Sequence, residues 1–110
     1  MFREHWQPKI VGEINESYVK IARIEGEFVW HHHEHEDELF FVVKGHLEIS
    51  LKEQEPLVLG PGDMTIIPRG VEHRPLAREE AWIMMIEPKS TVNTGSAADS
   101  ELTVDEEEWL

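Results

Sequence analysis

This chain of 110 residues contains no cysteine, and that absence removes several kinds of chemistry at once. Disulfide bonds, thiolate metal sites and cysteine nucleophiles are all excluded. No apolar stretch reaches the length of a membrane-spanning helix, so we expect a soluble protein. The first six residues also lack the apolar run that an export signal needs, and we therefore expect a cytoplasmic location.

Basic residues are scarce as well, because ten lysines and arginines stand against 23 aspartates and glutamates, for a formal net charge of −13. Nucleic acids and anionic membranes both favour basic patches, so neither is expected as a partner. Several of the acids lie in the last dozen residues and indicate a solvated tail. The length suits one domain with a single core.

Short apolar segments separated by turn residues occupy the chain up to residue 88. Their composition and alternation predict strands over residues 18–24, 27–33, 39–43, 47–51, 57–59, 64–67, 74–78 and 81–87. The segments Lys44-Gly45 and Gly60-Pro61-Gly62-Asp63 have the composition of tight turns. Strands at this spacing favour an all-β sandwich or barrel over alternating strand–helix units.

The composition changes after Pro88, where serine, threonine, asparagine, glycine and acidic residues replace the apolar pattern. We therefore divide the chain into a β domain over residues 1–88 and an acidic C-terminal arm over residues 89–110. The arm is expected to be packed on the barrel or partly disordered. Residues 106–110 are predicted to form one helical turn.

Three histidines and one glutamate form a candidate site for a divalent metal: His31, His33, Glu38 and His73. Three imidazoles and one carboxylate suit Mn, Fe, Ni, Co or Zn and leave coordination positions open for a substrate. Alternate residues of a strand share a face, so His31 and His33 can converge on one ion. Glu38 has the opposite parity, so the polar segment before it must turn or bulge. His73 is distant in sequence, and the site can exist only in the folded protein.

A second arrangement of ligands is open, because His35 shares the parity of His31 and His33. In that arrangement His33, His35 and Glu38 would bind the metal. The four residues between His33 and Glu38 favour the set that contains His31. His32 has the opposite parity and is expected to face outward.

These residues stand in two motifs that resemble those of the cupin superfamily, specifically its small single-domain members. The first cupin motif runs Gly-x5-His-x-His-x(3–4)-Glu-x6-Gly, and the segment from His31 to Gly45 fits it, although the leading glycine, Gly26, is one place too close. The second motif, Gly-x5-Pro-x-Gly-x2-His-x3-Asn, has Ala77 in place of its final asparagine. Its other positions are matched by Gly62, Pro68, Gly70 and His73.

The resemblance implies a cupin-type double-stranded β-helix, or jelly-roll barrel, that holds one divalent transition metal per chain. Cupins include sugar-phosphate isomerases, dioxygenases and decarboxylases, so it also implies a metal-dependent enzyme acting on a small molecule. The alternative is a non-catalytic module that binds metal and a small metabolite or sugar. Small cupins commonly pair through sheet faces, which favours a homodimer. The candidate residues for the dimer interface are Phe28, Trp30, Phe41 and Trp82. The same residues could instead form core between two sheets.

An apolar wall suited to a small ligand is expected around the metal. Its candidates are the apolar residues predicted to face the lumen: Val29, Phe40, Val42, Ile49, Ile66, Ile83 and Met85. The predicted substrate pocket comprises Phe40, Val42, Ile66, Arg69, Met85 and His35. Arg69 and Arg74 stand on either side of His73 and could bind an anionic substrate, although such arginines are more often surface ion-pair partners. No aspartate, tyrosine or lysine stands out as a dedicated base.

Overall fold

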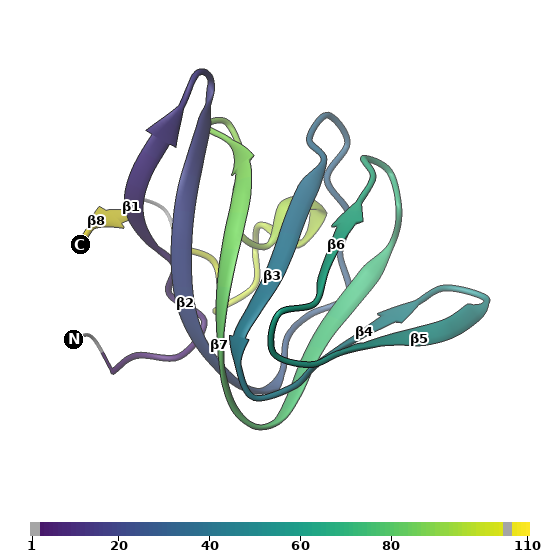
Figure 1. The fold of residues 1–110 in the computed structure, drawn as a ribbon. Coiled ribbons are helices and arrows are strands. Elements are labelled where there is room, and N and C mark those ends of the chain that lie inside the picture. The colour runs from purple at the N-terminus through teal and green to yellow at the C-terminus, as the bar shows by residue number, and fades with distance from the viewer. Residues whose placement is uncertain (1–2, 105–106) are drawn as a thin grey trace.

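A computed structural model describes residues 3–104 and 107–110 and confirms the predicted all-β class (Figure 1). The elements in chain order are β1 (Lys9–Ile14), β2 (Ser17–Glu27), β3 (Glu38–Lys44), β4 (Leu47–Leu51), β5 (Gln54–Leu59), β6 (Met64–Ile67), β7 (His73–Pro88), the 3₁₀ helix η1 (Gly95–Ala97) and β8 (Glu108–Trp109). The strand order is β5-β4-β7-β2-β1-β8, and β3 pairs with both β6 and β7. This hydrogen-bonded path does not close into a ring within the described ranges. No helix there is long and apolar enough to cross a membrane.

The long strand β7 organises the fold because it pairs with three other strands. One edge runs antiparallel to β2 along most of its length. The other edge pairs first with β4 and then with β3, and β3 carries β6 on its far side. The sequence predicted two separate strands over residues 74–78 and 81–87. In the structure both belong to the single strand β7, whose pairing with β2 shifts register opposite Ile24 to Gly26. The predicted break is therefore a bulge, where Figure 1 shows β7 bending sharply.

The core lies between the two halves of the bent sheet and consists of residues that alternate along the strands. Among the predicted lumen residues, the buried set is Phe40, Val42, Ile49, Ile83 and Met85. Val29 is only half-buried. Ile66 is 52% exposed, so its predicted inward position is wrong. The β3–β6 register explains this, because Ile66 pairs with the outward Leu39, whereas its neighbour Ile67 pairs with the buried Glu38.

The segment between β2 and β3 is a loop with one bridge, and not the strand predicted over residues 27–33. The bridge joins His31 to His73. The expected alternation is nonetheless present around it, since His31 and His33 are buried and His32 is half-buried. Phe28 departs from the prediction that it faces away from the lumen. It is 7% exposed and stacks on Trp6, with 4.7 Å between the ring centroids.

The chain after β7 folds back against this loop. Thr91, Asn93 and Thr94 are buried, and the Ser96 amide donates a hydrogen bond to the His32 carbonyl at 2.9 Å. Gly95 approaches that carbonyl so closely that a Cβ atom would clash with it. Residues 108–109 pair in parallel with β1 as β8, so the predicted helical turn is wrong there. Residue 106, also part of that prediction, lies outside the described residues.

Candidate metal centre

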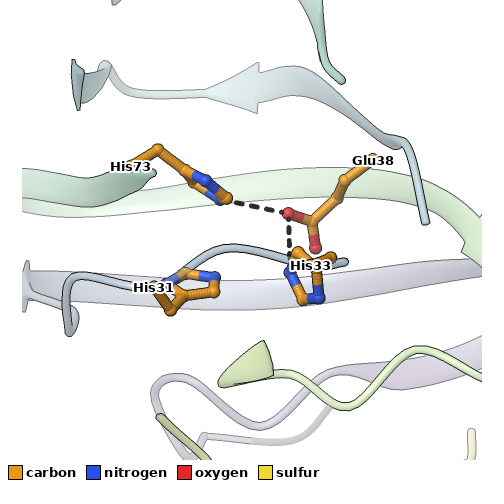
Figure 2. Close-up of side chains that lie close together, drawn as sticks. All are labelled: His31, His33, Glu38 and His73. Atoms are coloured by element: carbon orange, nitrogen blue, oxygen red, sulfur yellow. Dashed lines mark ion pairs between the residues drawn. The ribbon is translucent and has the colours of Figure 1, made fainter. Parts of the chain in front are cut away.

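Four side chains from three separate parts of the chain meet at one end of the core (Figure 2). His31 and His33 come from the loop after β2, while Glu38 and His73 are the first residues of β3 and β7. Each offers one ligand atom, and these atoms all lie within 4.8 Å of one another. All four residues are buried. The structure therefore brings together the set that the spacing predicted.

Two of the imidazoles are oriented by backbone carbonyls. His31 Nδ1 lies 2.9 Å from the Val29 oxygen, and His73 Nδ1 lies 2.9 Å from the Val71 oxygen. A carbonyl can only accept, so each Nδ1 carries the proton and donates it. The Nε2 lone pairs of both rings are then available to a metal ion.

Several buried atoms of the cluster have no hydrogen-bond partner within the described residues. They are His33 Nδ1 and Nε2, Glu38 Oε1 and His73 Nε2. Leaving one such buried atom unpaired costs about 1–3 kcal/mol. Glu38 Oε1 lies 3.4 Å from Nε2 of His33 and also 3.4 Å from Nε2 of His73. Two ligand atoms that each lie about 2.1 Å from the same ion, in directions at a right angle, are roughly 3 Å from each other. The observed separations are close to this value, so these residues fit a divalent transition metal.

Burial and close neighbours determine the charges of the cluster. Burial, with a further contribution from His73, lowers the pKa of His31 to about 4, so its imidazole is neutral at pH 7. Burial alone raises the pKa of Glu38, but the neighbouring Glu87, His33 and His73 side chains outweigh it and hold that pKa well below its usual range. A neutral imidazole and a carboxylate are the states that metal binding requires.

The structure distinguishes the two ligand sets that the sequence left open. The His35 side chain is 85% exposed and lies 3.8 Å from Glu34, whereas His31 is 1% exposed and belongs to the cluster. His32 faces away from the cluster and lies 3.0 Å from Glu72. The set with His31 is therefore the one that converges.

Neither flanking arginine lines the cavity beside the cluster. The Arg69 side chain is 64% exposed and lies 3.5 Å from Asp37. Arg74 pairs with Glu27 at 3.3 Å and lies over the Trp30 ring. Both arginines occupy the ion-pair role that such residues usually have.

A cavity of about 30 Å³ adjoins the cluster, which is room for roughly two water molecules. Most of its wall is apolar: it is formed by Trp6, Pro8, Ala22, Ile24, Phe28, His31, Glu38, Phe40, Pro75, Ile83, Met85, Glu87 and Asn93. Of the predicted pocket, Phe40 and Met85 line this cavity, and Val42 is buried in the core beside it. The other three, Ile66, Arg69 and His35, do not line it.

The sequence prediction missed two buried charged residues, Glu87 and Lys20. Lys20 Nζ lies 2.7 Å from Glu87 Oε1, and their side chains are 0% and 1% exposed. Burial, and then the neighbouring Glu38 carboxylate, raises the pKa of Glu87 well above its usual value. Both positions continue an inward alternation, Glu87 after Met85 and Lys20 before Ala22. Extending the two-residue alternation of buried positions to Glu87 and Lys20 would have predicted that both side chains point inward.

A model of the cupin domain family matches residues 17–87, and the chain belongs to this family. It resembles a crystal structure of a cupin-2 domain protein from Shewanella frigidimarina NCIMB 400, with 46% identity and a TM-score of 0.78, covering 80% of this chain and 85% of that one. The fold also resembles hydroquinone 1,2-dioxygenase from Sphingomonas sp. TTNP3, solved with 4-hydroxybenzoate, at 20% identity and a TM-score of 0.72 over 81% of this chain and 69% of that one.

Among curated proteins, the uncharacterised YdbB of Bacillus subtilis (strain 168) is 44% identical over 64 residues. That alignment covers 58% of this chain and 57% of YdbB, so the matched region spans little more than half of that relative.

Proposed function

We propose that His31, His33, Glu38 and His73 bind one divalent transition metal, and that the protein is a metal-dependent enzyme acting on a small molecule. The observation that supports this most directly is the convergence of buried ligand atoms without other partners. When bound, the metal would supply a Lewis acid for substrate oxygen atoms or, if it is iron, a centre for dioxygen chemistry. Mn, Fe, Ni, Co and Zn are all compatible with this donor set.

The wall of the cavity favours a neutral and largely apolar substrate. Its lining includes no lysine or arginine, and its two ionisable carboxyls belong to Glu38 and Glu87. A phosphate group would therefore find no lysine or arginine side chain among the lining residues to bind it. This supports dioxygenase-like chemistry over the sugar-phosphate isomerase type. Hydroquinone, named in the dioxygenase of similar fold, is one neutral compound of the favoured class.

The residues of this chain have separate roles in the proposal. Backbone carbonyls orient the imidazoles of His31 and His73, and the buried position of Glu38 keeps its carboxylate directed at the cluster. Apolar side chains such as Phe40 and Met85 exclude water from the adjoining space. This cavity itself admits a ligand larger than roughly two waters only if part of its wall moves.

The test begins with metal analysis of protein purified without chelator and of apo-protein reconstituted with each candidate metal. The loaded forms are then assayed with small phenols and diols, and with sugar phosphates of similar size. Turnover of a neutral compound is the expected result, and His73→Ala serves as the metal-deficient control. Turnover of sugar phosphates alone would contradict the substrate class. Ligand binding without turnover for every metal would favour a non-catalytic module, and absence of metal uptake would refute the proposed centre.

We also propose that the protein forms a homodimer through the outer face of β3 and β6. Val43, Met64 and Ile66 are each more than half exposed on these strands. A contiguous exposed apolar surface of this kind usually marks an interaction site. The sequence analysis had named Trp30, Trp82 and Phe28 as candidate interface residues. In the structure each of the two tryptophan rings lies beside two basic side chains, and Phe28 is buried.

A further inference from the structure

A groove of about 450 Å³ lies between the loop that carries His31 and His33 and the segment after β7. The loop and the later segment both contribute to its lining, which consists of His32, His33, Glu34, His35, Glu36, Ser90, Val92, Gly95 and Ser96. The two sides are joined by a hydrogen bond from Ser90 Oγ to Glu36 Oε2 at 2.9 Å. Since His33 is also a member of the candidate ligand set, the groove reaches the metal centre.

His33 stands between the groove and the cluster. Its Nδ1 lies 4.0 Å from Oε1 of Glu36, which lines the groove, and its Nε2 lies 3.4 Å from Oε1 of Glu38 in the cluster. Neither ring nitrogen has a hydrogen-bond partner within the described residues, whereas backbone carbonyls hold the rings of His31 and His73. The His33 ring can therefore turn without breaking a hydrogen bond to the described part of the chain.

A metal ion has to pass through the protein surface to reach this centre, because the four candidate ligands are at most 4% exposed. The cavity on the other side has a mostly apolar wall, and a charged ion is costly to move through apolar surroundings. The groove instead presents two carboxylates and three imidazoles, and no lysine or arginine is among its described lining residues. Charge of this sign attracts a divalent cation and raises its rate of encounter.

We infer that this groove is the path by which the divalent metal enters, with Glu34 and His35 as the outer capture groups and Glu36 and His33 as the inner ones. The inference rests on the proposed metal-binding function. Exposure of these side chains falls along the path: His35 is 85% exposed and Glu34 73%, whereas Glu36 is 15% exposed and His33 2%. His35 and Glu34 lie 3.8 Å apart and thus have a role at the entrance although they are outside the ligand set.

The first experiment blocks the groove. Because the chain contains no cysteine, Val92→Cys introduces a single thiol, at a lining position that is 42% exposed, and a bulky maleimide coupled to it obstructs the groove. Val58→Cys with the same label is the matched control, since Val58 is 65% exposed on β5 and does not line the groove. Stopped-flow absorption follows Co²⁺ uptake by the full-length apo-protein and Co²⁺ release to excess chelator. Circular dichroism confirms that each labelled protein is folded.

An obstructed path slows passage in both directions and leaves the equilibrium unchanged. The labelled Val92→Cys protein should therefore take up and release Co²⁺ about 10-fold more slowly than the labelled control, the effect of a barrier about 1.4 kcal/mol higher. Its final occupancy should equal that of wild type. Rates equal to those of the labelled control would overturn the entry path while leaving the metal centre intact.

The second experiment changes the charge at the entrance and needs no label, so it decides the matter if the labelled protein does not fold. Glu34→Lys should lower the rate of Co²⁺ uptake about 10-fold at low ionic strength, and the difference should shrink in about 1 M salt. Glu79→Lys is the matched control, because Glu79 is exposed on β7 and does not line the groove. Equal uptake by the two lysine variants would overturn the capture role. Failure of wild type to bind Co²⁺ at all would refute the centre and the entry path together.

Discussion

His31 and His73 exchange both of their backbone hydrogen bonds, with N–O distances of 3.0 and 2.8 Å, although they come from distant parts of the chain. The exchange places their imidazole centroids 4.3 Å apart. A bridge of this kind fixes the two Cα positions independently of any bound ion. The candidate centre is therefore largely organised by the backbone before a metal binds, and that organisation has measurable consequences.

Metal binding should raise the thermal stability of the protein, because the folded cluster binds the ion and the unfolded chain does not assemble it. At a free metal concentration 100 times the dissociation constant, the gain is about 2.7 kcal/mol. For a domain of this size that corresponds to a midpoint shift of roughly 10 °C. Differential scanning fluorimetry with chelator and then with added Co²⁺ or Zn²⁺ measures the shift. An equal shift in His73→Ala would mean that the ion binds elsewhere.

Loss of a converging histidine should cost metal occupancy, whereas loss of an exposed one should not. His73→Ala and His31→Ala remove buried ligand candidates, and His35→Ala removes a side chain that is 85% exposed. We expect near-complete loss of bound metal in the first two variants and wild-type occupancy in the third. Elemental analysis after desalting provides the measurement. Comparable losses in all three variants would show that the ligand set is wrong.

The metal-free protein should lose stability as the pH falls from 7 to 5. The pKa of His31 is lowered to about 4 in the folded state, against about 6.5 in the unfolded chain. The unfolded state binds more protons between these values, so protonation of His31 favours unfolding. This histidine should contribute about 2 kcal/mol of the loss over that interval. Urea unfolding in the presence of chelator is expected to show a shallower pH dependence for His31→Gln, and parallel profiles would contradict the prediction.

Gly95→Ala should destabilise the protein more than Gly62→Ala. Both glycines have positive φ, +49° and +87°, so both alanines carry the left-handed penalty of about 1–2 kcal/mol. At Gly95 the new Cβ would also meet the His32 carbonyl and lie 3.0 Å from His33 Nδ1, whereas nothing lies within 4 Å at Gly62. Relieving that overlap should cost a further 1–3 kcal/mol or so. Chemical denaturation of the two variants tests the difference, and equal losses would exclude a tight contact at Gly95.

The proposed dimer predicts that a charge on the outer sheet face produces monomers. Met64→Glu places a carboxylate where the side chain is 57% exposed, so the fold of the monomer should be little affected. Val58→Glu is the matched control, since Val58 is 65% exposed on β5, outside the proposed face. Light scattering after size-exclusion chromatography should give a dimer for the control and a monomer for Met64→Glu. A monomeric wild-type protein would refute the dimer.

Local patterns predicted the parts of the fold that depend on alternation and turn chemistry. The turn at Lys44-Gly45 connects β3 and β4 as expected, and Gly45 takes a φ of +83° that glycine adopts readily. Burial of Phe40 and Met85 follows from the same two-residue period. Ile66 could not be placed in this way because its strand is apolar on both faces. Only the pairing with Leu39 assigns it to the outside.

The sequence by itself determined the family, the all-β class and the four residues with metal-binding chemistry, because side-chain type and spacing are local properties of the chain. Tertiary structure decided that His31 and not His35 joins the cluster, that Phe28 turns inward, and that Glu87 and Lys20 lie behind Glu38. Those outcomes depend on the register between strands far apart in sequence, and no local pattern specifies that register uniquely.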